Sequence, residues 1–132
     1  MVEIEVFPSN RVTHPDKPVI IAPATVTHTA FDSSSTWLAT VDEGNVSIDS
    51  TFKTYLKIWK FDGETETYSL DTRFDAPHGH SRVSDLVFSA KEALVATAGE
   101  DGNVKLWATR QRESGTSTSV YAINLLLLMV CR

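Results

Sequence analysis

Three side chains in the second half of the chain are of the types that acyl-transfer enzymes use. His80, Thr97 and Asp101 supply an imidazole, a hydroxyl and a carboxylate within one short stretch. A hydroxyl beside an imidazole that a carboxylate orients is the arrangement of a nucleophilic hydrolase. Such an enzyme also needs donors for the oxyanion of its intermediate, and the sequence shows no signal for them. A hydrolase that uses His80 and Asp101 is therefore an alternative and not the leading interpretation.

The tripeptide His78-Gly79-His80 places two imidazoles close together, where they could form one edge of a metal site. A zinc site takes three or four protein ligands, and no further Cys, Asp or Glu follows at ligand spacing. The sequence also contains no glycine-rich loop of the kind that cradles phosphates. We therefore expect no metal site, no cofactor and no catalytic residue.

The composition is that of a folded protein with an acidic balance. Of 132 residues, 42% are hydrophobic and 22% are charged, which are ordinary values for a globular domain. The formal net charge of -5 argues against direct binding of nucleic acid, because such binding needs clustered Lys and Arg. No apolar run reaches the length of a membrane helix. We expect protein partners, at most indirect association with RNA, and no membrane contact.

Short apolar segments separated by turn residues indicate an all-β fold. Alternation of apolar and polar residues predicts a strand over 1–7, and a proline-rich loop follows up to residue 22. The polar stretch 44–55 is expected to be an exposed insertion. Further strands are predicted over residues 25–31, 37–41, 56–61, 67–74, 82–88, 93–98 and 103–108.

Two parts of the chain repeat each other. The segments 83–88 and 94–97 align with 26–31 and 37–40 at an offset of 57 residues. At the strands that end in tryptophan, 104–107 aligns with 56–59 at an offset of 48. The difference between the two offsets falls in the polar insertion of the first repeat. Repeats of about 40–45 residues with four strands each are typical of β-propellers.

The second repeat resembles the WD40 family. It carries Gly79-His80 before its first strand, Asp101-Gly102 in a turn and Trp107 at the end of its third strand. In that family a His, a Ser or Thr, an Asp and a Trp form a buried hydrogen-bonded tetrad. Closing such a network is favourable, because a buried polar group without a partner costs about 1–3 kcal/mol. The resemblance assigns the four roles to His80, Thr97, Asp101 and Trp107.

The first repeat matches this pattern only in part. Thr40 and Trp59 are the partial equivalents, but Pro23 stands where the histidine belongs and the insertion replaces the Asp-Gly turn. The resemblance therefore implies an incomplete network there. The chain divides into an N-terminal strand and loop (1–22), a first blade with insertion 44–55 (23–78), an incomplete second blade (79–119) and an apolar tail (120–132).

The chain from Phe7 to Arg110 further resembles the WD-repeat subunits of the t-UTP (UtpA) subcomplex of the small-subunit processome. The residues that carry this likeness are 37–43, the insertion, 56–59 and 76–78. It implies a non-enzymatic scaffold of the nucleus and nucleolus that supports pre-rRNA transcription and processing, with other subunits of a large ribonucleoprotein assembly as partners. Another WD40 adaptor, such as a substrate receptor of a ubiquitin ligase or a chromatin platform, is the alternative.

Two blades are fewer than the roughly four to eight that close a propeller. The resemblance therefore implies a piece of a longer protein. The tail 120–132 also lacks the alternation of a fourth strand, so we expect a truncated or misread gene product there. An edge strand or a short buried helix is the alternative.

Overall fold

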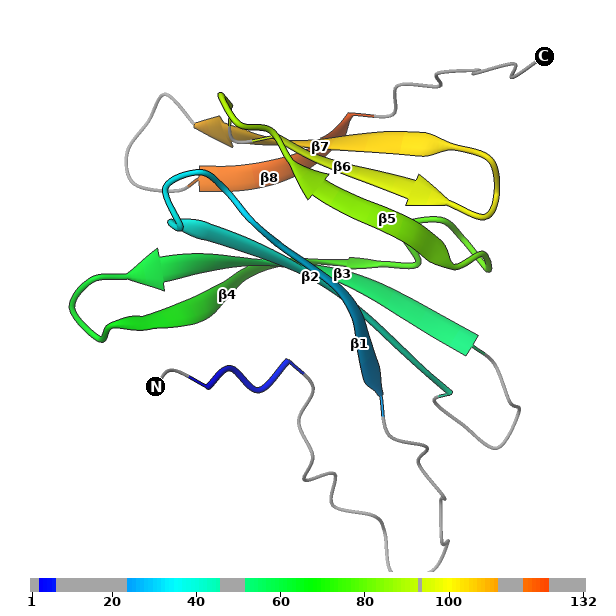
Figure 1. Ribbon diagram of the computed structural model, residues 1–132, viewed down its shortest axis with the longest axis horizontal. Helices are drawn as coiled ribbons and strands as arrows, with labels where there is room; N and C mark the ends of the chain where they lie inside the picture. The colour runs from blue at the N-terminus through cyan, green and yellow to red at the C-terminus, as the bar shows by residue number, and fades with distance from the viewer. Residues whose placement is uncertain (1–2, 7–23, 46–51, 93, 112–117, 124–132) are drawn as a thin grey trace, which may run out of the picture.

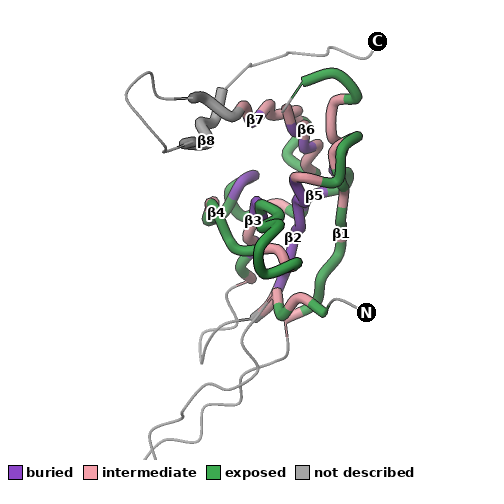
Figure 2. The backbone as a smooth tube through the Cα atoms, turned by 90° about the vertical axis from the view of Figure 1, so that its left-hand side faces the viewer, coloured by how far each residue is buried: buried purple, intermediate pink, exposed green. Residues whose placement is uncertain are grey.

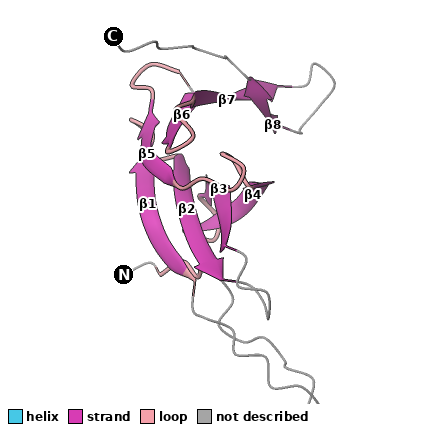
Figure 3. Ribbon diagram, turned by 90° about the vertical axis from the view of Figure 1, so that its right-hand side faces the viewer, coloured by secondary structure: helices cyan, strands magenta, loops and turns pink. Residues whose placement is uncertain are grey.

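The computed structural model describes residues 3–6, 24–45, 52–92, 94–111 and 118–123 of the chain (Figure 1). All its regular elements are strands, as Figure 3 shows, so the prediction of an all-β fold is confirmed. Within these residues, no helix has the length and apolar character needed to cross a membrane. The strands are β1 (Thr25–Phe31), β2 (Trp37–Asn45), β3 (Phe52–Asp62), β4 (Thr67–Asp75), β5 (Val83–Phe88), β6 (Leu94–Gly99), β7 (Val104–Gln111) and β8 (Thr118–Ile123).

The strands form two antiparallel sheets that follow the order of the chain. The first sheet has the order β1-β2-β3-β4 and the second has the order β5-β6-β7-β8. Short polar turns make these meanders possible. In the β1–β2 turn, for example, the Asp32 carboxylate accepts a hydrogen bond of 3.0 Å from the Trp37 backbone N–H. Such a side chain takes the place of a backbone partner and favours a tight turn.

The two sheets share the same irregularity in their first strands, which supports the repeat. The register of β1 shifts between Val26 and His28, and the register of β5 shifts between Val83 and Asp85. The extra residues are Thr27 and Ser84, which lie 57 positions apart, the offset of the repeat. Their hydroxyls donate to equivalent carbonyls of the second strands, Val41 at 3.3 Å and Ala98 at 3.2 Å.

Each sheet has two faces, and the core lies between unlike faces of the two sheets. We call the side that carries Ala39, Val41 and Ile58, with the aligned positions of the second sheet, the front face. The opposite side is the back face. The front face of the first sheet packs against the back face of the second. In Figure 2 the buried segments, which include most of β2, are purple. The buried core residues are Trp37, Ala39, Val41, Leu56 and Ile58 from the first sheet and Val83, Leu86, Val95 and Trp107 from the second.

The structure corrects the predicted bounds of the insertion. Strand β2 runs to Asn45 and β3 begins at Phe52, so both ends of the stretch 44–55 belong to a continuous ladder. Thr54 is only 2% exposed. Backbone pairing explains the difference, because a long hairpin extends as far as its register allows whatever the polarity of its residues.

Two further predictions at the ends of the chain are wrong in part. Residues 3–6, which fall in the predicted strand 1–7, belong to no strand. Their burial still alternates, because Ile4 and Val6 are half-buried whereas Glu3 and Glu5 are exposed. The predicted tail 120–132 begins inside β8, which runs to Ile123 and pairs with β7. The rest of the tail and most of the proline-rich loop lie outside the described residues.

Candidate functional site

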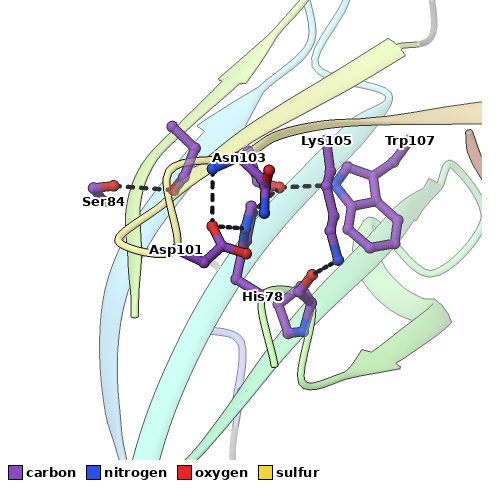
Figure 4. A network of polar contacts seen from close by, with 9 residues as sticks. His78, Ser84, Asp101, Asn103, Lys105 and Trp107 are labelled. Carbon is purple, nitrogen blue, oxygen red and sulfur yellow. Dashed lines mark hydrogen bonds and ion pairs between the residues drawn. The ribbon is translucent and has the colours of Figure 1, made fainter. Parts of the chain in front are cut away.

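A chain of hydrogen bonds runs through the second sheet and joins four side chains (Figure 4). The Trp107 indole Nε1–H donates to the Thr97 hydroxyl over 2.9 Å. The same hydroxyl lies 2.9 Å from His78 Nε2, and His78 Nδ1 lies 3.0 Å from Asp101 Oδ1. Thr97 is fully buried and His78 is 2% exposed. The network is therefore part of the interior of the protein.

The direction of each hydrogen bond follows from what its ends can do. An indole N–H can only donate, and a carboxylate can only accept. The Thr97 hydroxyl accepts from Trp107, so its own proton is free to bond to His78 Nε2. The proton on His78 Nδ1 then donates to Asp101. This assignment satisfies every member, which is what a buried polar network requires.

The histidine in this network is His78, so the prediction of His80 is wrong. The backbone turn before β5 explains the difference. Gly79 N–H donates to the Ala76 carbonyl and Ser81 N–H donates to the His78 carbonyl, with positive φ at Ala76 (51°) and Gly79 (63°). This geometry buries His78 and leaves His80 exposed. His80 instead lines a surface pocket of about 300 Å³ together with Phe52, Lys53, Thr54, Tyr55, Asp75, Ala76 and Gly79.

Gly99 leaves the space that the imidazole occupies. A Cβ atom at this position would overlap the His78 ring and Asp101 Oδ1. The sequence prediction missed this requirement, because the glycine is distant from the histidine along the chain. Only the pairing of β6 with β5 and the turn before β5 bring them together.

The turn between β6 and β7 holds Asp101 in place. Asn103 N–H donates to Asp101 Oδ1 over 3.0 Å, and Gly102, with φ of 79°, donates to the Gly99 carbonyl. Burial raises the pKa of Asp101, but hydrogen bonds from Asn103 and from His78 outweigh this effect and lower the pKa overall. Asp101 is therefore an ionised acceptor at neutral pH.

The first sheet repeats only part of this network. Trp59 Nε1–H donates to the Thr40 hydroxyl over 3.0 Å, so both predicted partial equivalents are brought together. The structure describes no residue at the position of Pro23. At the position aligned with Gly99 stands Asp42, which is 1% exposed and forms an ion pair of 2.9 Å with Lys57.

The Asp42 carboxylate is in an unfavourable environment. Burial raises its pKa. A hydrogen bond from Lys57 and the positive charges of Lys57 and Arg73 lower the pKa, but burial outweighs them. Lys57 also donates to the Val6 carbonyl over 2.5 Å. The aligned lysine of the second sheet, Lys105, instead donates to the Pro77 carbonyl. The sequence prediction missed this ion pair, because a charged residue in a strand is ordinarily exposed.

The arrangement does not support the hydrolase alternative. The imidazole that Asp101 bonds to is that of His78 and not that of His80. The Thr97 hydroxyl already accepts one hydrogen bond and is fully buried. A nucleophile must reach its substrate, and a side chain with no exposed surface does not. Among the described residues, no group of three or more His, Cys, Asp or Glu side chains is placed to hold a metal ion.

Comparison with known proteins identifies the repeat. Residues 19–124 match a family model described as the second beta-propeller of WD repeat-containing protein 75. The chain is 35% identical over 85 residues to WD repeat-containing protein 75 of Danio rerio, and 30% identical over 86 residues to that of Mus musculus. Each alignment covers 62% of this chain and 10% of the relative.

A fungal protein is similar over a shorter stretch. The U3 small nucleolar RNA-associated protein 17 of Schizosaccharomyces pombe is 37% identical over 57 residues, which are 42% of this chain and 7% of the relative. The chain thus spans a tenth or less of the length of these three relatives.

Proposed function

Because the chain belongs to the family of the second beta-propeller of WD repeat-containing protein 75, we propose that it is a non-enzymatic protein-interaction scaffold in assembly of the small ribosomal subunit. The observation that carries the non-enzymatic part is the buried network of His78, Thr97, Asp101 and Trp107. These side chains join β6, β7 and the turn before β5. Of the three groups that sequence reasoning offered for catalysis, Thr97 and Asp101 belong to this network, where they help to fix the fold.

Two observations support the role in ribosome assembly and the indirect contact with RNA. The fungal relative is, by its name, associated with U3 small nucleolar RNA. The net charge of -5 gives this chain little electrostatic attraction to phosphates. We therefore place its contacts on protein subunits of a ribonucleoprotein assembly in the nucleolus, with RNA association through those subunits.

The proposal is tested by expressing a tagged chain in Danio rerio cells and measuring the U3 small nucleolar RNA that purifies with it. We expect enrichment of this RNA and nucleolar fluorescence of a tagged copy. The His80→Ala variant changes an exposed side chain outside the network, and we expect it to keep the enrichment. Recovery of ubiquitin-ligase or histone-modifying subunits without this RNA would favour the adaptor alternative.

A second measurement separates indirect from direct association. Purified chain and a U3 transcript are mixed at low salt, where phosphate contacts are strongest. We expect no retention of the transcript on a filter. Tight binding that weakens steeply with salt would refute indirect association and leave the scaffold role in place.

A further inference from the structure

The first residues of β3 have a paired strand on one side only. Strand β2 pairs with β3 from Phe52 onward, whereas β4 pairs with β3 only from Tyr55 onward. Next to that point the Ala76 N–H donates to the Thr54 carbonyl over 2.9 Å, and the chain then turns with positive φ (51°) at Ala76. Among the described residues, no strand pairs with Phe52 and Lys53 on this side. Strand β3 therefore begins with a short free edge.

The backbone groups of Phe52 are directed toward the open side. In a strand, the N–H and C=O groups of alternate residues point to the same neighbour. The Thr54 carbonyl points to the side of β4, because it accepts from Ala76 there. The N–H and C=O of Phe52 point the same way, beyond the end of β4. Phe52 is thus placed to exchange the two hydrogen bonds of one antiparallel pair with a further strand.

A pocket of about 300 Å³ lies along this free edge. One side of it is formed by residues 52–55 of β3, and the other side includes Asp75, Ala76 and Gly79, at the end of β4 and in the turn that follows. The volume is at the lower end of the range for ligand sites in proteins. It suits a short segment of chain that runs along the edge.

One positive charge at the pocket is not neutralised. The Arg73 guanidinium lies 2.8 Å from the Asp75 carboxylate, and that of Arg82 lies 3.9 Å from the Glu43 carboxylate. Lys53, which is exposed and lines the pocket, forms no ion pair with any of the described residues. The pocket therefore has a local excess of positive charge in a chain whose net charge is -5.

This lysine determines which strand the edge accepts. A lysine on a free edge ordinarily discourages pairing, because a further strand would bring an apolar or like-charged side chain against the ammonium group. A carboxylate on the added strand removes that obstacle, because it pairs with Lys53. The edge therefore disfavours basic and apolar strands and admits an acidic one.

We propose that an extended acidic segment of a partner protein pairs with β3 at Phe52 and places a carboxylate beside Lys53. In strand addition of this kind, main-chain hydrogen bonds supply affinity and side chains supply specificity. The inference rests on the proposed role as a protein-interaction scaffold and gives the chemistry of one partner. A nucleic acid fits less well, because its phosphates would pair with Lys53 but its backbone has no amide N–H for the Phe52 carbonyl.

The test measures the binding of short fluorescent peptides to the complete purified chain by fluorescence anisotropy. Three peptides alternate valine with glutamate, with glutamine or with lysine, and an oligouridylate serves as the RNA probe. We expect the glutamate peptide to bind at least roughly tenfold more tightly than the glutamine peptide, and the lysine peptide to bind most weakly. We expect no binding of the oligouridylate.

Reversal of the lysine charge is the decisive variant. Lys53→Glu should reverse the order, so that the lysine peptide binds more tightly than the glutamate peptide. Lys91→Glu is the matched control, because it reverses the charge of an exposed lysine between β5 and β6 and should keep the original order. Circular dichroism checks that each variant is folded. If Lys53→Glu does not fold, Lys53→Gln takes its place and should abolish the preference for glutamate.

A peptide with N-methylated backbone amides separates strand addition from attraction by charge alone. It keeps the glutamates but cannot donate to the Phe52 carbonyl, so we expect its binding to weaken by about tenfold or more. The proposal is overturned if the glutamate peptide does not bind, if the Lys53 variant keeps the original order, or if methylation has no effect. Displacement of the glutamate peptide by the oligouridylate would also overturn it.

The outcome is independent of the purification of U3 small nucleolar RNA. A chain that enriches this RNA but binds no acidic peptide would overturn the pocket and leave the proposed scaffold role in place. A chain that binds the glutamate peptide in the expected order but does not enrich the RNA would overturn the role in ribosome assembly and leave the pocket in place.

Discussion

The first and second sheets share one hydrogen bond and differ in what surrounds it. Trp59 donates to Thr40 and Trp107 donates to Thr97 at aligned positions of the repeat. In the second sheet, Gly99 leaves room for the His78 ring, which links the pair to an exposed turn. In the first sheet, Asp42 stands at the position of that glycine and pairs with a lysine.

One repeat position decides which kind of polar group each sheet buries. A glycine admits an imidazole from a neighbouring turn, and the resulting hydrogen bonds run without interruption to an ionised carboxylate near solvent. A carboxylate at the same position brings its charge into the interior, where desolvation opposes the attraction to Lys57. The first sheet therefore relies on a charge pair that the second sheet does not need.

Removal of the imidazole has the largest expected effect. His78→Ala leaves a cavity and deprives Thr97 and Asp101 of their shared partner, so we expect the free energy of unfolding to fall by about 3 kcal/mol. His80→Ala is the matched control, with an expected change within about 0.5 kcal/mol, as for other surface sites. Urea unfolding measures both. Equal losses in the two variants would contradict the stabilising role assigned to His78.

Removal of one partner of the ion pair tests the first sheet. Asp42→Ala leaves Lys57 buried without its carboxylate, and we expect a loss of about 3 kcal/mol or somewhat less, because Lys57 keeps its contact with Val6. The double variant Asp42→Leu with Lys57→Met replaces both charges by apolar groups and should recover most of the loss. A double variant as unstable as the single one would refute this explanation. Urea unfolding again supplies the free energies.

A methyl group at Gly99 tests the space in the second sheet. Gly99→Ala forces the Cβ atom against His78 and Asp101, and we expect a loss of about 2 kcal/mol from overpacking. Gly63→Ala is the control, because nothing lies within 4 Å of the Cβ it would add. Thermal unfolding followed by circular dichroism compares them. A stability of Gly99→Ala like that of the control would contradict the assigned role.

The smallest expected effect concerns the pH dependence of stability. The two carboxylates should change it in opposite directions. The pKa of Asp101 is lowered, so its contribution is present above the usual aspartate pKa of about 3.9 and is lost as the pH falls through the lower value. The pKa of Asp42 is raised, so its contribution is present below about 3.9 and is lost as the pH rises through the higher value. Unfolding of Asp101→Asn and Asp42→Asn across this range measures both slopes, and slopes of the same sign would refute the assignment.

The sequence predicted the strands better than the side chains that join them. Strand β1 has the predicted bounds, because its apolar residues and the serine-rich turn after it are local signals. The histidine of the network was misplaced because His78 and His80 are two residues apart and only the backbone angles of the turn distinguish them. The burial of Asp42 had no local signal at all. It follows from strand pairing and from the repeat position it occupies.

The indole protons of the two sheets allow the opening of each sheet to be measured separately by hydrogen exchange. Trp59 and Trp107 each donate a side-chain hydrogen bond to a buried threonine, and both rings are 6% exposed or less. Such protons exchange with solvent deuterium only when the structure around them opens. If the sheets separate before they unfold, the two indole signals will exchange at different rates. If the interface opens only with the whole fold, they will exchange together.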